Sequence, residues 1–288
     1  MSKRIVNRIV MAVLAASCMS ASAFAKNANS IQVKGSDTMV NLVQAWAEEY
    51  MKTSPEVFIA VTGGGSGTGL AALINGTCDM AMSSREIKFQ EIEQAKKEGV
   101  APKELKVALD GLAVVVNPKN PVSKLTIDQL AGVFTGKIKN WKEVGGTDTK
   151  ILLLSREVNS GTHVYFKEHV LQKGDPKVKE EFSPEALLLS SSQAIADEVK
   201  QNPDAIGYYG MGYIGKDQKA IAVAKDTGSP YVAPTVESVS NGTYPISRPL
   251  FLYTNGKPQG AVKRFADYVL SPEGQAVVLK ADFVPLNQ

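Results

Sequence analysis

The sequence predicts an α/β protein of two lobes, each built on a mixed sheet flanked by helices, with two strands crossing between them. The first observation behind this prediction is that strand-patterned segments alternate with segments of helical periodicity, an order that places helices on the faces of a sheet. The second is that two long apolar strand segments, near 111–118 and 245–253, bracket the middle of the chain. Two such crossings can join lobes that hinge shut on a ligand.

The chain before residue 107 follows the alternating order. Apolar residues such as Leu42, Val43 and Trp46 recur at helical spacing, and Gly76 and Gly99 mark helix ends. The expected strands are "SIQVKG" (30–35), "EVFIAV" (56–61) and "DMAMS" (79–83), and the expected helices are "TMVNLVQAWAEEYMKT" (38–53), "GLAALING" (69–76) and "FQEIEQAKKEG" (89–99).

The remainder of the chain holds a second α/β set between the two crossing strands. A helix capped near Thr126 is followed by a compact turn around Trp141, which we expect to be buried. The later expected elements are a strand "ILLLS" (151–155), a helix from Gly161, a helix "SQAIADEVKQ" (192–201), a strand "AIGYYG" (205–210), and closing helices "AVKRFADYVLS" (261–271) and "EGQAVVLKA" (273–281).

The first 25 residues resemble a secretory signal peptide. They combine a basic start, an apolar run at 9–16 that is too short to span a bilayer, and a small-x-small site that ends at Ala25. We therefore expect cleavage after Ala25. The alternative is a lipid on Cys18, because the residues before it faintly resemble a lipoprotein box.

Removal of this segment leaves 288 − 25 = 263 residues, enough for two lobes. We place one lobe at 26–112 plus 250–288 and the other at 113–249. The segment holds three basic residues and no acidic ones, so the formal charge of +3 becomes 3 − 3 = 0. A broad basic field for nucleic acid or a membrane surface is thus excluded. Cys78 remains as the single cysteine, which excludes an internal disulfide, and we expect it to be buried.

Four polar stretches follow strands, and three of them directly precede helices. The first turn of a helix offers unpaired backbone N–H groups and a partial positive charge, which favour an anion. Glycine allows close approach and a hydroxyl adds a donor. The stretches are Gly35-Ser36-Asp37-Thr38-Met39, Gly63-Gly64-Gly65-Ser66-Gly67-Thr68-Gly69, Ser83-Ser84-Arg85, and Arg156 with Ser160-Gly161-Thr162.

Each stretch alone is compatible with ordinary helix capping. Arg156 is harder to explain in that way, because a cation shortly before a helix start is repelled by the positive end of the helix. The alternative for Arg156 is a structural ion pair, with Glu157 as one local partner. Arg85 is open to both interpretations.

Competing chemistries fit the sequence less well. The glycine-rich stretch lacks the Lys-Ser/Thr ending of a P-loop, and Thr68 stands where a nucleophile elbow needs glycine. His163 and His169 lie six residues apart, so they do not share a helix face and make a poor metal pair or catalytic base. We expect no metal, no cofactor and no catalytic residue.

Several segments together resemble the periplasmic phosphate-binding components of phosphate-import ABC transporters. The likeness runs from about residue 31 to the C-terminus, and its most specific parts are "FTGKIKNWKEVGG" and "R-x-x-x-SGT". The other segments are "VKGSDTMVNLVQAW", "TGGGSGTGLAALINGTCDMAMSSR" and "AIGYYG". The resemblance implies a type II periplasmic binding protein fold, a periplasmic location, phosphate as ligand, and permease subunits as partners. It also implies a monomer without enzymatic activity.

The resemblance also assigns binding residues by position. The implied phosphate contacts come from hydroxyls, backbone amides and a single charged donor: Thr38, Met39, Ser66, Ser84, Arg156, Ser160, Gly161 and Thr162. Four neighbouring residues are additional candidates: Ser36, Asp37, Gly67 and Arg85.

One position departs from the family pattern. The best-known members carry an aspartate where this chain has Ser84, and that carboxylate accepts the proton of HPO₄²⁻. Sulfate has no proton to give, so the carboxylate rejects it. We hypothesise that Asp37 acts as the acceptor here. Sulfate, molybdate or tungstate remain alternative ligands, and a secreted hydrolase or a sensory or adhesive protein on the same fold remain alternative functions.

Overall fold

The computed structural model describes residues 29–286. The expected signal peptide, its cleavage site and Cys18 lie outside the described residues. The strands are β1 (Ser30–Gly35), β2 (Phe58–Thr62), β3 (Met80–Ser83), β4 (Pro102–Val116), β5 (Lys124–Thr126), β6 (Leu152–Arg156), β7 (Leu187–Leu189), β8 (Ala205–Gly210), β9 (Lys219–Ala220), β10 (Ala222–Ala224) and β11 (Ser247–Asn255).

Helices follow most of these strands. The longer helices are α2 (Val40–Thr53), α3 (Ser66–Ile74), α4 (Phe89–Lys97), α5 (Ile127–Phe134), α6 (Gly161–Phe166), α7 (Ser192–Gln201), α8 (Val236–Ser240), α9 (Gly260–Leu270) and α10 (Pro272–Lys280). Short 3₁₀ turns are η1 (Asp37–Met39), η2 (Trp141–Val144) and η4 (Met211–Tyr213), and a π turn, η3 (Lys167–Leu171), extends α6.

The predicted alternation of strands and helices is confirmed. Capping explains several boundaries: the Thr126 hydroxyl accepts from the Gln129 amide, and the Gln129 side chain accepts from the Thr126 amide in return. Ser191 caps α7, and Ser271 caps α10 with Pro272 at its first position. Short strands such as β7 and β9 were not expected.

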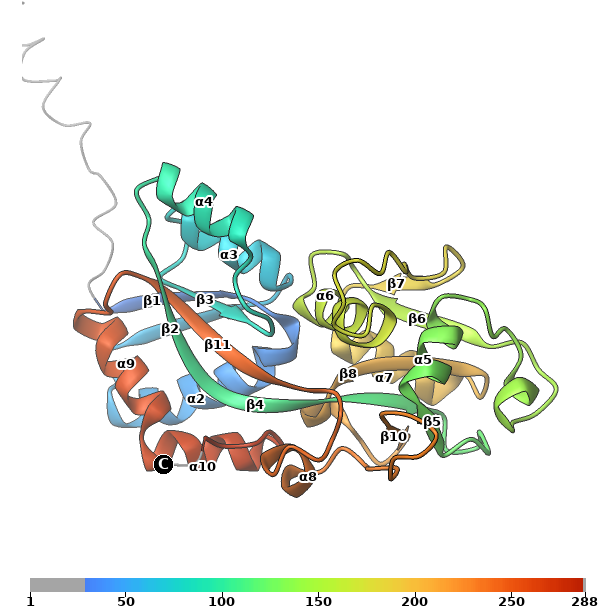
Figure 1. The fold of residues 1–288 in the computed structure, drawn as a ribbon. Helices are drawn as coiled ribbons and strands as arrows, with labels where there is room; N and C mark the ends of the chain where they lie inside the picture. Colours follow the sequence, from blue (N-terminus) through green and yellow to red (C-terminus); the bar gives the residue numbers. More distant parts are fainter. Residues whose placement is uncertain (1–28, 287–288) are drawn as a thin grey trace, which may run out of the picture.

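Strand β4 runs from one half of the molecule into the other, and β11 lies beside its first part (Figure 1). Residues 102–111 of β4, apart from Val107 at a bulge, pair with β11, and Leu112–Val116 pair with β8. We expected two mixed sheets. Because β4 is long enough to belong to both, they form one path in the order β2-β1-β3-β11-β4-β8-β6-β7, with β9 beside β4 and a separate β5–β10 pair.

Buried apolar side chains form two large groups. One lies between the β1–β3 sheet and helices α2, α9 and α10, around Trp46. The other surrounds Trp141, which is fully buried as expected, and packs α5 and α6 against β4 and β8. Cys78 is also buried, 6% exposed. Two cores joined by long strands are compatible with the lobe boundaries at 112/113 and 249/250, which stay a prediction.

Candidate functional site

Three serines of the first half meet in a buried cluster. Ser36 follows β1, Ser84 follows β3, and Ser66 begins α3. The Ser36 hydroxyl donates to Ser84 Oγ at 2.9 Å, and Ser66 Oγ lies 3.4 Å from Ser84 Oγ and accepts from the Ser84 amide at 3.1 Å. None of the three is more than 2% exposed. The parallel pairing of β1 with β3 brings these strand ends to one edge of the sheet.

The second half joins this cluster through the start of α6. Thr162 Oγ1 lies 2.8 Å from Thr38 Oγ1, and both side chains are fully buried. A Cβ added to Gly161 would lie only 2.3 Å from Ser66 Oγ and 2.7 Å from Ser84 Oγ. Residues more than 75 positions apart in sequence therefore share one small polar volume, which we call the hydroxyl cluster: Ser36, Thr38, Ser66, Ser84, Ser160, Gly161 and Thr162.

Ser160 has the ordinary capping role as well. Its Oγ accepts from the amides of Thr162 and His163, at 3.2 and 3.4 Å. A hydroxyl that accepts through its oxygen keeps its proton for another acceptor. The Met39 amide, by contrast, donates to the Ser36 carbonyl at 3.0 Å in this conformation.

Arg156 lies beside the cluster and is 1% exposed. Its Nη2 donates to Asp37 Oδ2 at 2.8 Å and to the Ser190 carbonyl at 2.9 Å, and its Nε donates to the Leu189 carbonyl at 3.2 Å. The ion-pair partner is thus Asp37 from the other half, and not the local candidate Glu157. Burial lowers the pKa of Arg156 from its ordinary value, and the Asp37 carboxylate opposes that shift.

Asp37 also fixes the glycine-rich loop, because its Oδ1 accepts from the Gly64 amide at 2.9 Å. Asn159 ties the same loop to the second half: its side chain donates to the Gly64 carbonyl at 2.9 Å, and its carbonyl accepts from the Gly67 amide at 3.0 Å. The halves are therefore in direct contact at the candidate site. Asn159 was not singled out from the sequence.

Arg85 is occupied by a structural partner. Its Nη1 and Nη2 donate to both oxygens of Glu91, at 2.8 and 2.7 Å. This bidentate pair supports the loop between β3 and α4 next to the hydroxyl cluster.

Sequence reasoning missed Arg248, which is buried as Arg85 and Arg156 are. Arg248 on β11 pairs with Asp110 on β4, and both side chains are 0% exposed. Arg248 Nη2 also donates to Thr162 Oγ1 at 3.0 Å and to Thr38 Oγ1 at 3.4 Å. The signal in the sequence is a lone charged residue in each of two otherwise apolar strand segments.

The two histidines pack against aromatic rings. His163 lies 4.5 Å from Phe182 and His169 lies 3.9 Å from Tyr165, measured between ring centroids. His163 Nδ1 is 2.8 Å from the Arg156 carbonyl, to which it can only donate, so it is not a base for the nearby Ser155. Within residues 29–286, His, Cys, Asp and Glu side chains form no group of three or more that could hold a metal ion.

Comparison with known proteins gives consistent matches. A family model described as a PBP superfamily domain matches residues 20–273. The chain is 36% identical over 269 residues to the phosphate-binding protein PstS of Pseudomonas aeruginosa, covering 88% of this chain and 81% of that protein. It is 35% identical over 266 residues to PstS of Bacillus subtilis, covering 91% and 82%.

Two solved structures are also similar to this chain. One from Clostridium perfringens, named as a phosphate ABC transporter substrate-binding protein with bound phosphate, is similar with a TM-score of 0.81 and 33% identity, covering 90% of this chain and 100% of that chain. An ABC-type phosphate transport receptor from Vibrio cholerae is similar with a TM-score of 0.69 and 31% identity, covering 89% and 100%.

Replacement of Gly161 by alanine tests the contact between the halves. The added methyl has no room between Ser66 and Ser84, so we expect Gly161→Ala to hold the halves apart and to increase the radius of gyration measured by small-angle X-ray scattering. The control is Gly228→Ala, where the new Cβ would lie 3.5 Å from Asp226 Oδ1, an ordinary contact. An unchanged radius for Gly161→Ala would contradict the close packing described here.

Proposed function

We propose a function from the family to which the chain belongs: it is a member of the PBP superfamily and, within it, of the phosphate-binding proteins named PstS. The chain captures inorganic phosphate and delivers it to the permease of a phosphate ABC transporter. The observation that carries this function is the hydroxyl cluster, in which buried donors from both halves of the molecule meet beside Arg156.

Phosphate binds between the halves in this proposal. Its contacts are the hydroxyls of Thr38, Ser66, Ser84, Ser160 and Thr162, the amides of Met39 and Gly161, and the Arg156 guanidinium. Hydrogen bonds to a charged group contribute about 1.5–3 kcal/mol each, so several of them can give micromolar or tighter binding. Closure of the halves strengthens each bond, because water leaves the site.

No covalent step belongs to this function. The hydroxyls of Ser36, Ser66 and Ser84 contact one another, as do those of Thr38 and Thr162, and no histidine ring is among the partners described above for these five hydroxyls. Capture followed by release to the permease needs donors that bind reversibly, which hydroxyls, amides and a guanidinium supply.

Asp37 has a second role in this account. Its Oδ2 faces Arg156, so a bound HPO₄²⁻ that contacts Arg156 comes close to a carboxylate that can accept its proton. This supports the hypothesis that Asp37 is the hydrogen-bond acceptor for the phosphate proton. Ser84 has no carboxylate for that role. A fully ionised anion such as sulfate would meet repulsion at the same place.

The proposed function also includes export of the chain to the periplasm and movement of its lobes. The chain is exported by its N-terminal segment, cleaved after Ala25, and acts in the periplasm as a monomer of two lobes, 26–112 plus 250–288 and 113–249. No helix among residues 29–286 has the length and apolar character needed to cross a membrane. The hinge of β4 and β11 lets the lobes open to admit phosphate and close over it.

Calorimetric titration of the chain without residues 1–25 tests the function directly. We expect phosphate to bind with a dissociation constant of about 1 μM or lower, and the same titration in excess sulfate to give nearly the same constant. Absence of binding heat with phosphate at several temperatures would contradict the function. Suppression by sulfate would change the ligand to a broader class of tetrahedral oxyanions.

Loss of the Arg156 guanidinium tests the charged contact. We expect Arg156→Ala to weaken phosphate binding about tenfold or more, since a hydrogen bond between charged groups is worth ~1.5–3 kcal/mol. The matched control is Arg264→Ala on the exposed face of α9, which we expect to bind as the unchanged chain does. A loss under about twofold in Arg156→Ala would remove this residue from the site.

Asp37→Asn tests the origin of selectivity. The amide keeps the shape of the side chain but removes the charge that repels sulfate, so we expect the ratio of phosphate to sulfate affinity to fall. The measurement is competition of sulfate against labelled phosphate. If both the phosphate affinity and the ratio stay unchanged, Asp37 is not the proton acceptor.

A further inference from the structure

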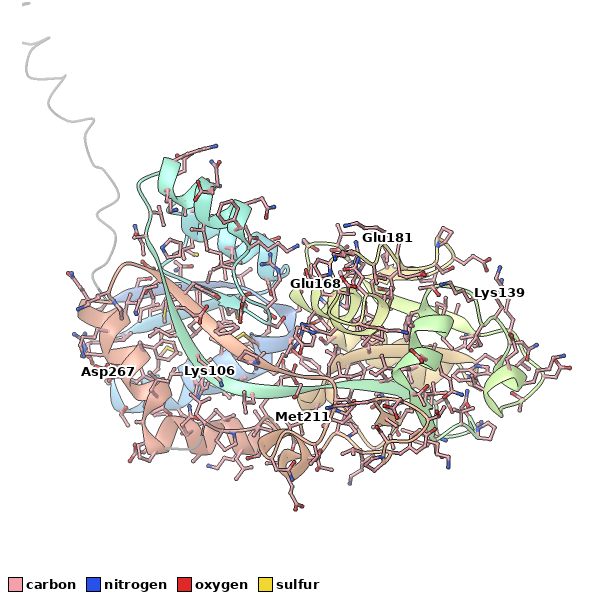
Figure 2. All side chains as sticks on the ribbon, viewed as in Figure 1. Lys106, Lys139, Glu168, Glu181, Met211 and Asp267 are labelled. Atoms are coloured by element: carbon pink, nitrogen blue, oxygen red, sulfur yellow. The ribbon has the colours of Figure 1, made fainter. Side chains whose placement is uncertain are left out.

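Arg248 and Asp110 form an ion pair where the crossing strands face each other. The two residues are register partners of β11 and β4, and Arg248 Nε and Nη2 donate to Asp110 Oδ2 at 3.0 and 2.9 Å. Asp110 Oδ1 accepts from the Met211 amide at 3.0 Å, and Met211 lies near the middle of the molecule between the two halves (Figure 2). The carboxylate is therefore fixed on both oxygens.

Stability alone does not explain this pair. Removal of two charges from water costs several kcal/mol per ion, and apolar residues of similar volume often serve as well or better. The neighbouring strand residues are apolar: Val107 to Leu109 precede Asp110 on β4, and Leu250 to Leu252 follow Arg248 on β11. Burial raises the pKa of Asp110, while Arg248 opposes that shift.

The guanidinium contacts the hydroxyl cluster. Arg248 Nη2 donates to the hydroxyl oxygens of Thr38 and Thr162, which come from different halves. These two oxygens lie 2.8 Å apart, so one proton can be shared between them. Because the guanidinium occupies oxygen lone pairs, the second hydroxyl proton is left to point at another acceptor.

One nitrogen of Arg248 has no hydrogen-bond partner. Nη1 is buried and contacts no acceptor among the described residues. Buried donors are nearly always satisfied, and an unpaired one is destabilising, more so when it is charged. A cavity of about 440 Å³ is lined by Arg248 and Tyr165 and by the exposed residues Glu86 and Lys88, so open space lies next to this buried arginine.

We propose that Arg248 is a second cationic ligand of the bound oxyanion: Nη1 donates to a phosphate oxygen, Nη2 orients the hydroxyls of Thr38 and Thr162, and Asp110 holds the guanidinium in place. The proposal rests on the proposed function and extends its ligand set. The phosphate oxygens then face donors from two guanidinium groups, each of which is held by a carboxylate, Arg156 by Asp37 and Arg248 by Asp110. Because Arg248 stands on the hinge and touches both halves, it also links binding of the anion to closure.

Two variants test the role of Arg248. Arg248→Lys keeps a charge opposite Asp110 but replaces the planar fork by one nitrogen, which cannot stand at the Nη2 position beside Asp110 and at the Nη1 position of the proposed phosphate contact together. The pair Asp110→Asn with Arg248→Gln removes both charges without leaving one buried and unpaired. For both proteins we expect a cooperative thermal transition and a phosphate affinity, measured by calorimetry, about tenfold or more below that of the unchanged chain.

The control is the double change Arg264→Gln with Asp267→Asn on the exposed face of α9, which removes the same two charges. We expect it to leave phosphate affinity unchanged. If Arg248 were only structural, every variant with the melting temperature of the unchanged chain would also have its phosphate affinity. A stable Arg248→Lys protein whose phosphate affinity is within about twofold of that of the unchanged chain would therefore overturn the proposal. Failure of the unchanged chain to bind phosphate would instead overturn the proposed function.

Discussion

The contact between the Thr38 and Thr162 hydroxyls is the interaction on which the rest of the structure depends. It joins the start of α2, through η1, to the start of α6, and it lies in an interior where polar groups need partners. The serines of the first half form a hydrogen-bonded group at the neighbouring strand ends, Arg248 donates to both threonine oxygens, and Arg156 pairs with Asp37, the residue before Thr38. A polar centre of this kind is stable in an interior when its groups are hydrogen-bonded, as the contacts among these hydroxyls provide.

Much of the fold follows from local sequence signals. Helix α7 and strand β8 occupy the residues expected for them, because clear periodicity and flanking polar residues mark their ends. Short strands such as β7 and β9 lack such signals, since two or three residues show no period and their pairing depends on neighbours distant in sequence. The sequence also does not predict that the main sheet has one continuous strand order. That order depends on the point along β4 where its pairing partner changes from β11 to β8.

The candidate site could be predicted in its local parts only. Glycines and hydroxyls before a helix are visible in a short window, so the sequence alone singles out Thr38, Ser66 and Ser160 as candidates. The ion-pair partner of Arg156 could not be predicted from the sequence, because Asp37 lies 119 residues away and comes close only when the halves meet. Arg248 and Asp110 did carry a signal, a single charge within an apolar strand, but its meaning needed the register that places them opposite each other.

Phosphate bound to the hydroxyl cluster is the central claim, and a crystal structure of the chain grown with phosphate tests it most directly. The account predicts one tetrahedral ion between the halves, with its oxygens about 2.7–3.2 Å from the Thr38, Ser66 and Ser160 hydroxyls and from the Arg156 guanidinium. An ion bound elsewhere, or one that contacts residues of a single half while Arg156 stays paired only with Asp37, would contradict it.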